Sequence, residues 1–198
     1  MPFIAFEGVD GVGKTSIINI LIDMLSHHKL YIYSEPSNEF GYIAKYGDSN
    51  ALLHDIDLLY LWWVARKYEI RKFGFQNADI ILADRYYDST YVYLNKYFDK
   101  HMTYHNYDSN FFPQPDITFV LEAESHITLT RSREDMIDRF KPSDITKIDD
   151  RKKIFRELTK LPQNKNRLFY FIETDGKSLT DIAHICLKYI AESDSIWK

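Results

Sequence analysis

The sequence contains almost no cysteine and no long basic tract. Cys186 is the single cysteine among 198 residues, so no internal disulfide can form, and its apolar surroundings favour a buried small side chain. The net charge is -4 at pH 7. Because proteins that bind DNA or RNA neutralise many phosphates with clustered Lys and Arg, we expect no nucleic-acid partner. A few well-placed arginines can still bind a small anion.

Long apolar runs are missing as well. The apolar runs of the chain are far shorter than the roughly 20 residues that a helix needs to cross a bilayer. The chain enters an apolar segment at Phe3 without the charged and apolar regions of a secretory signal. We therefore expect no membrane partner and a cytoplasmic location.

Length and composition indicate one domain, residues 1–198, because 45% of the residues are hydrophobic and can form a substantial core. Five apolar segments are predicted as strands: Phe3–Glu7, Leu30–Tyr33, Ile80–Asp84, Ile117–Leu121 and Phe169–Ile172. Helix-compatible stretches separate them, at residues 14–27, 52–73, 86–98, 124–140, 149–161 and 178–192. This alternation predicts an α/β fold with a parallel sheet and helices on both faces. The segment from Asp99 to Pro115 is predicted as a loop.

Charged residues stand at the ends of three predicted strands. Glu7 ends the first strand, Glu35 follows the second, and Asp84 and Arg85 end the third. Because ligands of such sheets bind at the carboxyl ends of the strands, this edge is the predicted active site.

The segment Gly8–Thr15 (GVDGVGKT) matches the phosphate-binding pattern G-x-x-x-x-G-K-[ST], between a predicted strand and a predicted helix. In this context backbone N–H groups and the helix N-terminus bind the phosphates of a nucleoside triphosphate. Lys14 is placed for the β- and γ-phosphates, and the Thr15 hydroxyl can bind Mg²⁺. The residues predicted to bind the triphosphate are Gly8, Gly11, Val12, Gly13, Lys14, Thr15 and Ser16.

The third predicted strand supplies a second phosphate motif. It ends in Asp84, the usual form of the carboxylate that anchors Mg²⁺ in phosphate-loop enzymes, partly through water. Arg85 follows at once and suits bidentate phosphate binding. The alternative is an ordinary surface Asp-Arg pair at a strand end.

These motifs resemble those of the thymidylate kinase family. Phe6–Thr15 (FEGVDGVGKT) resembles its F-E-G-x-D-G-x-G-K-T signature, and Asp84–Tyr93 (DRYYDSTYVY) resembles its D-R-Y-x-x-S-x-x-A-Y segment. Pro115–Leu121 is similar to its P-D-L-T-x-x-L strand. The spacing from Leu121 to Arg131 is similar to the family's route into an arginine-bearing lid.

The resemblance implies a P-loop kinase with a three-layer fold and a small lid at about residues 131–148. It implies transfer of the γ-phosphoryl group of ATP to thymidine monophosphate with Mg²⁺, by a homodimer. Asp10 matches the acidic residue near the acceptor and the metal, and Arg85 matches the arginine that holds the acceptor's phosphate. Asp175 and Gly176 match the turn that borders the adenine.

A tryptophan and an arginine are predicted to recognise the acceptor base. Tyr60–Arg66 (YLWWVAR) aligns with the family's L-L-F-A-A-D-R, so Trp62 matches the phenylalanine that stacks on thymine and Arg66 the arginine that binds the base. Thr90 and Tyr93 match positions that face the base and deoxyribose. Residues four apart share one helix face, so Trp62 and Arg66 can contact one base. Alternatively Trp62 packs in the core and the Arg66 side chain extends to solvent.

Two departures from the family pattern bear on specificity. The family often has R-E-P-G-G-T where this chain has Ser34–Glu39 (SEPSNE), so the arginine and both glycines are missing. Glu35 remains and can bind the metal through water. Leu94 stands where the family has glutamine. These differences leave phosphoryl transfer as the expected reaction but weaken the case for strict thymidylate specificity.

The phosphate loop contains no arginine, although the transferring phosphoryl group needs positive charge around it. The lid segment supplies three candidates: Arg131, Arg133 and Arg139. On a helix, Arg131 and Arg139 nearly share a face and Arg133 points elsewhere. An ordinary charged surface helix is the alternative.

Other functions remain open at this point. A deoxynucleoside kinase would use Glu35 as a base, and a monophosphate kinase of another base preference would keep the same phosphate sites. A GTP-driven switch is disfavoured, because the sequence lacks the Asn-Lys-x-Asp element that recognises guanine in such proteins. A regulator without catalysis is disfavoured, because Lys14, Thr15, Asp84 and Arg85 are all present.

Overall fold

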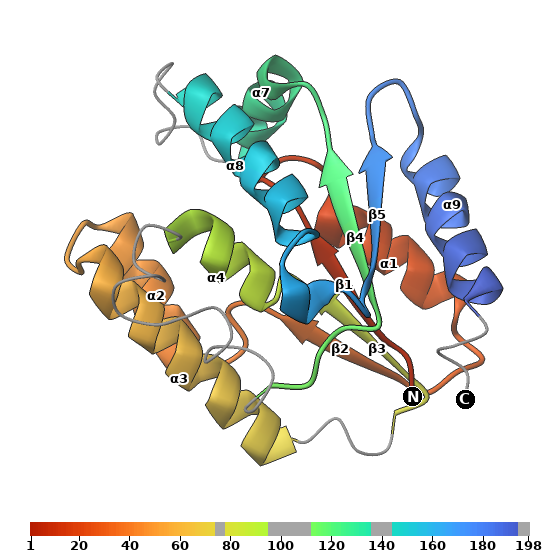
Figure 1. The fold of residues 1–198 in the computed structure, drawn as a ribbon, viewed down its shortest axis with the longest axis horizontal. Coiled ribbons are helices and arrows are strands. Elements are labelled where there is room, and N and C mark those ends of the chain that lie inside the picture. The colour runs from red at the N-terminus through yellow and green to blue at the C-terminus, as the bar shows by residue number, and fades with distance from the viewer. Residues whose placement is uncertain (74–77, 95–111, 136–143, 194–198) are drawn as a thin grey trace.

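A computed structural model describes residues 1–73, 78–94, 112–135 and 144–193. Its centre is a five-stranded parallel sheet in the order β2-β3-β1-β4-β5 (Figure 1). The strands are β1 (Phe3–Glu7), β2 (Leu30–Ser34), β3 (Ile80–Asp84), β4 (Ile117–Glu122) and β5 (Leu168–Glu173). All five predicted strands are confirmed, with shifts of one residue at a few ends.

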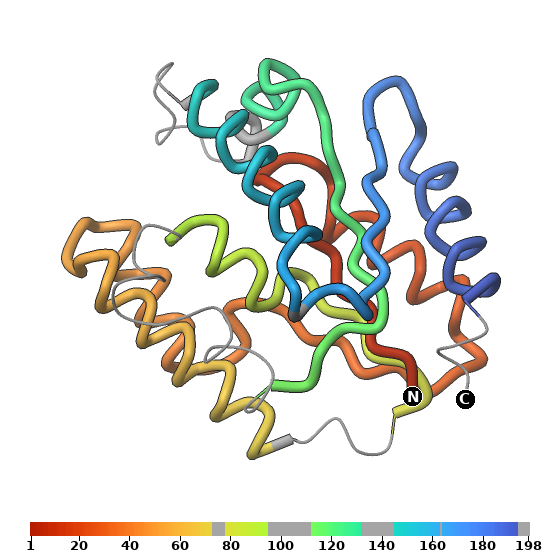
Figure 2. The backbone as a smooth tube through the Cα atoms, viewed as in Figure 1, coloured from red at the N-terminus to blue at the C-terminus, as the bar shows by residue number. Residues whose placement is uncertain are grey.

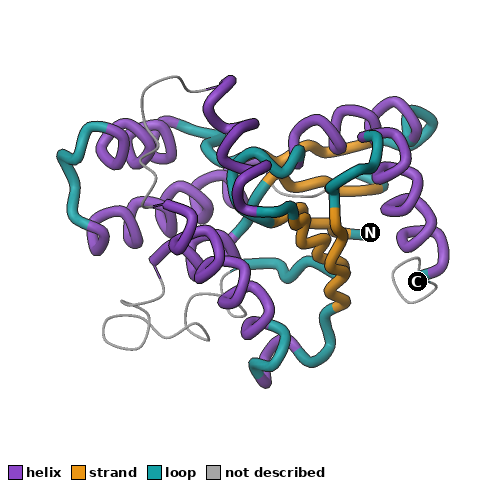
Figure 3. The backbone as a smooth tube through the Cα atoms, turned by 90° about the horizontal axis from the view of Figure 1, so that it is seen from above, coloured by secondary structure: helices purple, strands orange, loops and turns teal. Residues whose placement is uncertain are grey.

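Helices cover both faces of this sheet, which confirms the three-layer arrangement (Figure 3). Helices α1 and α9 pack together on one side, and α2, α3, α4 and α8 lie on the other (Figure 1). The helices are α1 (Lys14–Met24), α2 (Glu39–Ser49), α3 (Asp55–Phe73), α4 (Tyr87–Leu94), α7 (Ser125–Asp135), α8 (Asp144–Leu158) and α9 (Leu179–Glu192). A short 3-10 turn, Pro162–Asn164, follows α8.

The strands separate two hydrophobic cores. Side chains alternate between the two faces of a strand, so Ile4 and Phe6 of β1 enter the core under α1 and α9. Phe3 and Ala5 enter the core on the opposite face. Because all of β1 is buried on both faces, its sequence is a continuous apolar run, as expected for a central parallel strand.

Helix α2 is a described element that the sequence pattern did not predict. It packs alongside α3 (Figure 2) and contains two buried glycines, Gly41 and Gly47. A Cβ added at Gly41 would lie 2.8 Å from the Pro36 Cβ, and one at Gly47 would lie 2.2 Å from a Leu53 methyl group. The glycines weaken helix propensity but allow this close packing, and the Asn38 side chain caps the helix by accepting from the Gly41 N–H.

Several predicted boundaries move. The helix predicted from residue 52 begins at Asp55, and the one predicted from residue 149 begins at Asp144. Helix α1 ends at Met24, before the predicted residue 27. Most of the loop predicted from Asp99 and the middle of the predicted lid, residues 136–143, fall outside the described residues.

Within the described ranges, none of the helices combines the length and the apolar character needed to cross a membrane.

Candidate functional site

The phosphate loop joins β1 to α1 through a backbone that only glycine accommodates. Gly8, Gly11 and Gly13 have φ angles of 132°, 81° and 92°, a region that side chains with a Cβ rarely adopt. A Cβ at Gly8 would also lie 2.4 Å from the Leu121 carbonyl oxygen of neighbouring β4. The loop therefore passes close to the sheet and ends at the N-terminus of α1, where N–H groups can bind phosphate.

Lys14 is the first residue of α1 and is buried beneath the loop. Its Nζ donates to the carbonyl oxygens of Val9 (2.7 Å) and Gly8 (3.2 Å). Burial and the nearby Arg85 charge lower the pKa of Lys14 to about 7, although Asp10 and neighbouring carboxylates oppose that shift. A bound phosphate would favour the charged form, so this amine is suited to bind an anion.

Thr15 and Asp84 form the candidate metal position. The Thr15 hydroxyl donates a hydrogen bond to the Asp84 carboxylate at the end of β3. A hydroxyl and a carboxylate are oxygen ligands that Mg²⁺ accepts, and Mg²⁺ usually completes its shell with water and substrate phosphates. The described residues contain no cluster of three or more metal-binding side chains, which such a phosphate-dependent site does not require.

Arg85 lies between the phosphate loop and α4. Its backbone has a φ of 68°, and its N–H donates to the Phe6 carbonyl oxygen at 3.0 Å. Its guanidinium donates to the Gly8 carbonyl oxygen (3.0 Å), to the Ser89 hydroxyl (2.9 Å) and to Asp10 (2.5 Å). This left-handed backbone conformation is uncommon for arginine. Residues in such uncommon conformations are often found at functional sites.

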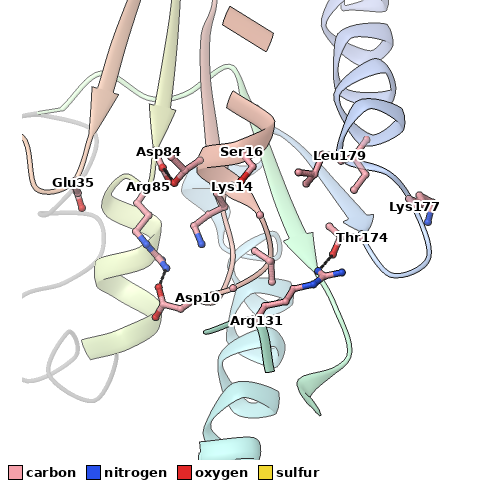
Figure 4. A pocket seen from close by; sticks show the side chains of 15 residues that line it. Asp10, Lys14, Ser16, Glu35, Asp84, Arg85, Arg131, Thr174, Lys177 and Leu179 are labelled. Carbon is pink, nitrogen blue, oxygen red and sulfur yellow. Dashed lines mark hydrogen bonds and ion pairs between the residues drawn. The ribbon is translucent and has the colours of Figure 1, made fainter. Parts of the chain in front are cut away.

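Asp10 extends from the phosphate loop toward Arg85 (Figure 4). Desolvation alone would raise its pKa, but Arg85 and Lys14, with a smaller contribution from Arg151, outweigh it and hold the pKa at about 2. The carboxylate is therefore charged throughout the physiological range. Its negative charge lies near the cations Arg85, Lys14 and Arg151, which could also bind phosphates.

A cavity of about 580 Å³ opens between the phosphate loop, the end of β3 and the start of α9. Arg131 of α7 points into it and donates to the Thr174 hydroxyl at 3.5 Å (Figure 4). The predicted residues that line the cavity are Asp10, Gly11, Val12, Gly13, Lys14, Thr15, Ser16, Glu35, Asp84, Arg85 and Arg131. The sequence patterns missed Thr174, Lys177, Leu179 and Ile182, which also line it. Arg139 lies outside the described residues, and the Arg133 side chain is not described.

Arg66 is fully buried and does not extend to solvent. Its Nε donates to Glu35 at 2.6 Å, and its Nη2 donates to the Thr90 hydroxyl at 3.0 Å. The guanidinium also lies against the Tyr86 ring. Three residues predicted on the acceptor side, from three separate segments, therefore meet in one network. Glu35 is held further by the Tyr33 hydroxyl, which donates to it at 2.8 Å.

Trp62 is half-buried and packs against the core on the α2 and α3 side of the sheet. A Cβ at Gly41 would lie 3.4 Å from its ring, so Trp62 packs close to α2. The neighbouring Trp63 points toward Phe112, with ring centroids 6.0 Å apart. The stacking of Trp62 on a base stays a prediction.

The predicted adenine turn connects β5 to α9. Asp175 accepts a hydrogen bond from the Glu124 N–H at 2.5 Å, and Gly176 has a φ of 69°. Both lie beside Thr174 and Lys177 of the cavity lining but are not part of that lining. Their contact with adenine also stays a prediction.

Buried polar side chains contact Arg85 and the start of α4 from the interior of the protein. Glu7 at the end of β1 accepts from the Tyr86 N–H (2.8 Å) and from the Ser89 hydroxyl. Burial and the Asp88 charge raise the pKa of Glu7 to about 8. Asp88 pairs with Arg167 at 2.5 Å in the same interior. The sequence patterns gave no signal for Arg167, because its partner is 79 positions away.

Comparisons with known proteins identify the family of the chain. The sequence model of the thymidylate kinase family matches residues 6–177. A probable thymidylate kinase of Sulfolobus acidocaldarius is 30% identical over 173 residues, covering 85% of this chain and 86% of the relative. One from Saccharolobus solfataricus is 28% identical, covering 96% of this chain and 97% of the relative.

Solved structures agree on the fold. A thymidylate kinase from Candida albicans has a TM-score of 0.68 at 20% identity, covering all of this chain and 93% of its own. One from Ehrlichia chaffeensis has a TM-score of 0.66 at 20% identity, covering 96% and 98%. The match of the family model over residues 6–177 and the 30% identity to the Sulfolobus acidocaldarius relative establish that the chain belongs to the thymidylate kinase family.

Proposed function

We propose that this kinase binds ATP along the phosphate loop and binds thymidine monophosphate against Asp10 and Arg85, so that the γ-phosphoryl group passes between them. The observation that carries this proposal is the position of Arg85. Its guanidinium bonds to Gly8 of the loop and to Asp10, so it lies next to the Lys14 position without belonging to the loop. An arginine there can hold a phosphate that is already on the acceptor while the loop holds the donor.

Mg²⁺ fits the Thr15 and Asp84 oxygens described above. When bound, the ion would neutralise charge on the β- and γ-phosphates. Thr15 and Asp84 would hold it directly or through water, and Glu35 lines the same cavity. In the structure Arg66 and Tyr33 both donate to one oxygen of Glu35, Oε1, so a contact of this carboxylate with metal-bound water would use its other oxygen.

The lid is proposed to supply positive charge to the transferring group. Arg131 lines the cavity opposite Arg85 (Figure 4), so among the three candidates it has direct support from the described residues. Charge from the lid fits the absence of arginine from the phosphate loop, because phosphoryl transfer depends chiefly on positioning and charge neutralisation.

Base recognition is proposed for Trp62, Arg66, Thr90 and Tyr93. Arg66 donates to the Thr90 hydroxyl oxygen, which leaves the Thr90 proton free to donate to a base carbonyl. Trp62 lies one helical turn before Arg66 on α3 and offers a ring for stacking.

A deoxynucleoside kinase would need a carboxylate that removes the proton of a hydroxyl group. Glu35 was the candidate for that role. Its oxygen is occupied by Arg66, which is fully buried, and by Tyr33. Both contacts fix the orientation of Glu35, whereas Arg85 beside the phosphate loop is placed to hold a phosphate on the acceptor, so the geometry favours the monophosphate as acceptor.

We also infer a homodimer in the cytoplasm. Large apolar side chains of α2 and α3 are exposed in the single chain: Tyr42, Ile43, Tyr46, Tyr60 and Val64. Exposed apolar side chains on one pair of packed helices favour an interface with a second copy.

The central experiment measures ADP release with thymidine monophosphate, the other natural monophosphates, and thymidine as acceptors. Without the acceptor phosphate Arg85 would lose a charged partner. We therefore expect the kcat/KM for thymidine to be at least about tenfold lower than that for thymidine monophosphate. The Lys14→Ala variant should lose nearly all transfer with every acceptor while remaining folded. A higher kcat/KM for thymidine than for its monophosphate would place the protein among nucleoside kinases.

A further inference from the structure

Arg151 of α8 lies beside the acceptor side of the site, although no sequence motif indicated it. Its Cζ is 4.0 Å from the centroid of the Tyr93 ring, and the Cζ of Arg85 is 5.4 Å from the same centroid. The Tyr93 hydroxyl donates to Asp10 at 3.4 Å. One aromatic ring is therefore in contact with two guanidinium groups and with the carboxylate of the phosphate loop.

The chain on both sides of Arg151 is fixed against the sheet. Lys152 donates to the Ala123 carbonyl oxygen and to the Ser125 hydroxyl, and Arg156 pairs with Glu122 at the end of β4. Phe155 is buried in the core. Arg151 is thus presented to Tyr93 by an anchored helix rather than by a free surface segment.

The guanidinium of Arg151 has hydrogen-bonding capacity left over. Among the described residues it forms no hydrogen bond or ion pair. Stacking on an aromatic ring uses the flat face of a guanidinium and leaves its N–H groups free in the plane. Those groups can bind phosphate oxygens in bidentate fashion.

The charge around Arg151 also indicates an anion. Asp10 faces the cations Arg85, Lys14 and Arg151, and all three lower its pKa. Asp84 is a second carboxylate that acts on Lys14 and Arg85, so the three cations face two carboxylates. A phosphate next to Arg85 would restore the balance and would lie within reach of the second guanidinium on the Tyr93 ring.

We propose that Arg151 is a second phosphate-binding arginine for the acceptor, acting together with Arg85, whose guanidinium lies against the same Tyr93 ring. The acceptor side is favoured over the donor side because Arg151 shares Tyr93 and Asp10 with Arg85. The donor end of the cavity has its own arginine, Arg131, beside Thr174. This inference rests on the proposed function.

The test compares Arg151→Ala with Lys153→Ala, which removes the same charge from an exposed position of α8. Calorimetric titrations of each variant with thymidine monophosphate, thymidine and ATP give the dissociation constants, and ADP release gives KM and kcat. For Arg151→Ala we expect thymidine monophosphate to bind about tenfold more weakly or worse, the scale of a lost charged hydrogen bond. In Arg151→Ala the affinities for thymidine and ATP should change by less than about twofold. In Lys153→Ala the affinities for all three ligands should change by less than about twofold.

The Arg151→Lys variant separates binding from packing. It keeps the charge but loses the planar fork, so it should recover part of the affinity for thymidine monophosphate. Equal weakening of thymidine and its monophosphate, a matching loss of ATP affinity, or unchanged binding in Arg151→Ala would each overturn the proposal. Failure of the proposed function is recognised separately, because the wild-type protein would then not phosphorylate thymidine monophosphate.

Discussion

The burial and the hydrogen bonds of single residues in this site depend on partners that lie far away in the sequence. The position of Arg66 four residues after Trp62 was enough to predict a shared helix face. Its full burial and its bonds to Glu35 and Thr90 could not be predicted, because they depend on three segments that only the folded sheet brings together. Lys14 and Thr15, in contrast, belong to one local motif whose sequence already contains its geometry.

Glu7 leads to a prediction about pH. Its pKa of about 8 in the folded protein, raised mainly by burial and the Asp88 charge, compares with 4.5 for an ordinary glutamate. Between pH 4.5 and 8 the unfolded chain therefore loses a proton that the folded chain keeps. Stability contributed by this group is present at low pH and is lost as the pH rises through that window.

The Glu7→Gln variant should remove this pH dependence, because the amide stays neutral. The measurement is the free energy of unfolding in urea at pH 5.5 and pH 7.5, for the variant and the wild type. The wild type should lose more stability over this interval than the variant. Identical losses would show that Glu7 is ionised in the folded protein.

At the scale of elements, strands were more predictable than helices. The strands are apolar runs bounded by polar residues, and burial on both faces produces that pattern directly. Helix α2 was missed because Gly41 and Gly47 oppose a helix in isolation. The two glycines allow close packing against Pro36 and Leu53. A local sequence pattern does not show these contacts.

Gly41→Ala should therefore destabilise the protein in spite of the better helix propensity of alanine. The new Cβ would meet Pro36 at 2.8 Å and the Trp62 ring at 3.4 Å. Overpacking costs about 1–3 kcal/mol, which exceeds the gain of about 1 kcal/mol in propensity. Thermal or urea unfolding measures the difference, with Lys45→Ala at an exposed position of α2 as the control. A more stable Gly41→Ala protein would show that α2 shifts away from Pro36 at little cost.

The lid prediction concerns Arg131 of α7. Its removal should lower kcat by about 10³-fold, the low end of the range for an arginine that stabilises the transferring phosphoryl group. The ATP dissociation constant should change much less, because such a contact acts mainly in the closed complex. Single Ala variants of Arg131, Arg133 and Arg139 are compared in the same assay. Near wild-type kcat in all three would leave this segment as an ordinary charged helix.

At the scale of the whole molecule, alternation of strands and helices predicted a parallel sheet with two helical layers, and that architecture is confirmed. The strand order β2-β3-β1-β4-β5 was not predicted, because apolar runs of similar character do not identify their neighbours. The order matters for function, since it places the ends of β1 and β3 together and so brings Arg85 to the phosphate loop.

The proposed dimer is tested on α2. Tyr42 and Tyr46 are one turn apart and are 60% and 65% exposed, so they share a face. Replacing both by Glu should turn a dimer into a monomer in size-exclusion chromatography with light scattering. Ile145→Glu, at an exposed apolar position of α8, should leave the mass unchanged. A wild-type protein that is monomeric at every concentration would exclude the interface.

One peptide oxygen links the two halves of the site. The Gly8 carbonyl oxygen accepts from Lys14 at 3.2 Å and from Arg85 at 3.0 Å, so the group proposed to hold ATP and the group proposed to hold the acceptor share a single acceptor atom. When a phosphate draws one cation away, the other gains the oxygen alone. The two substrates should therefore not bind independently, and thermodynamic reciprocity requires each to change the affinity of the other by the same factor. Titration of thymidine monophosphate with and without a non-hydrolysable ATP analogue measures that factor, and the coupling should disappear in Lys14→Ala.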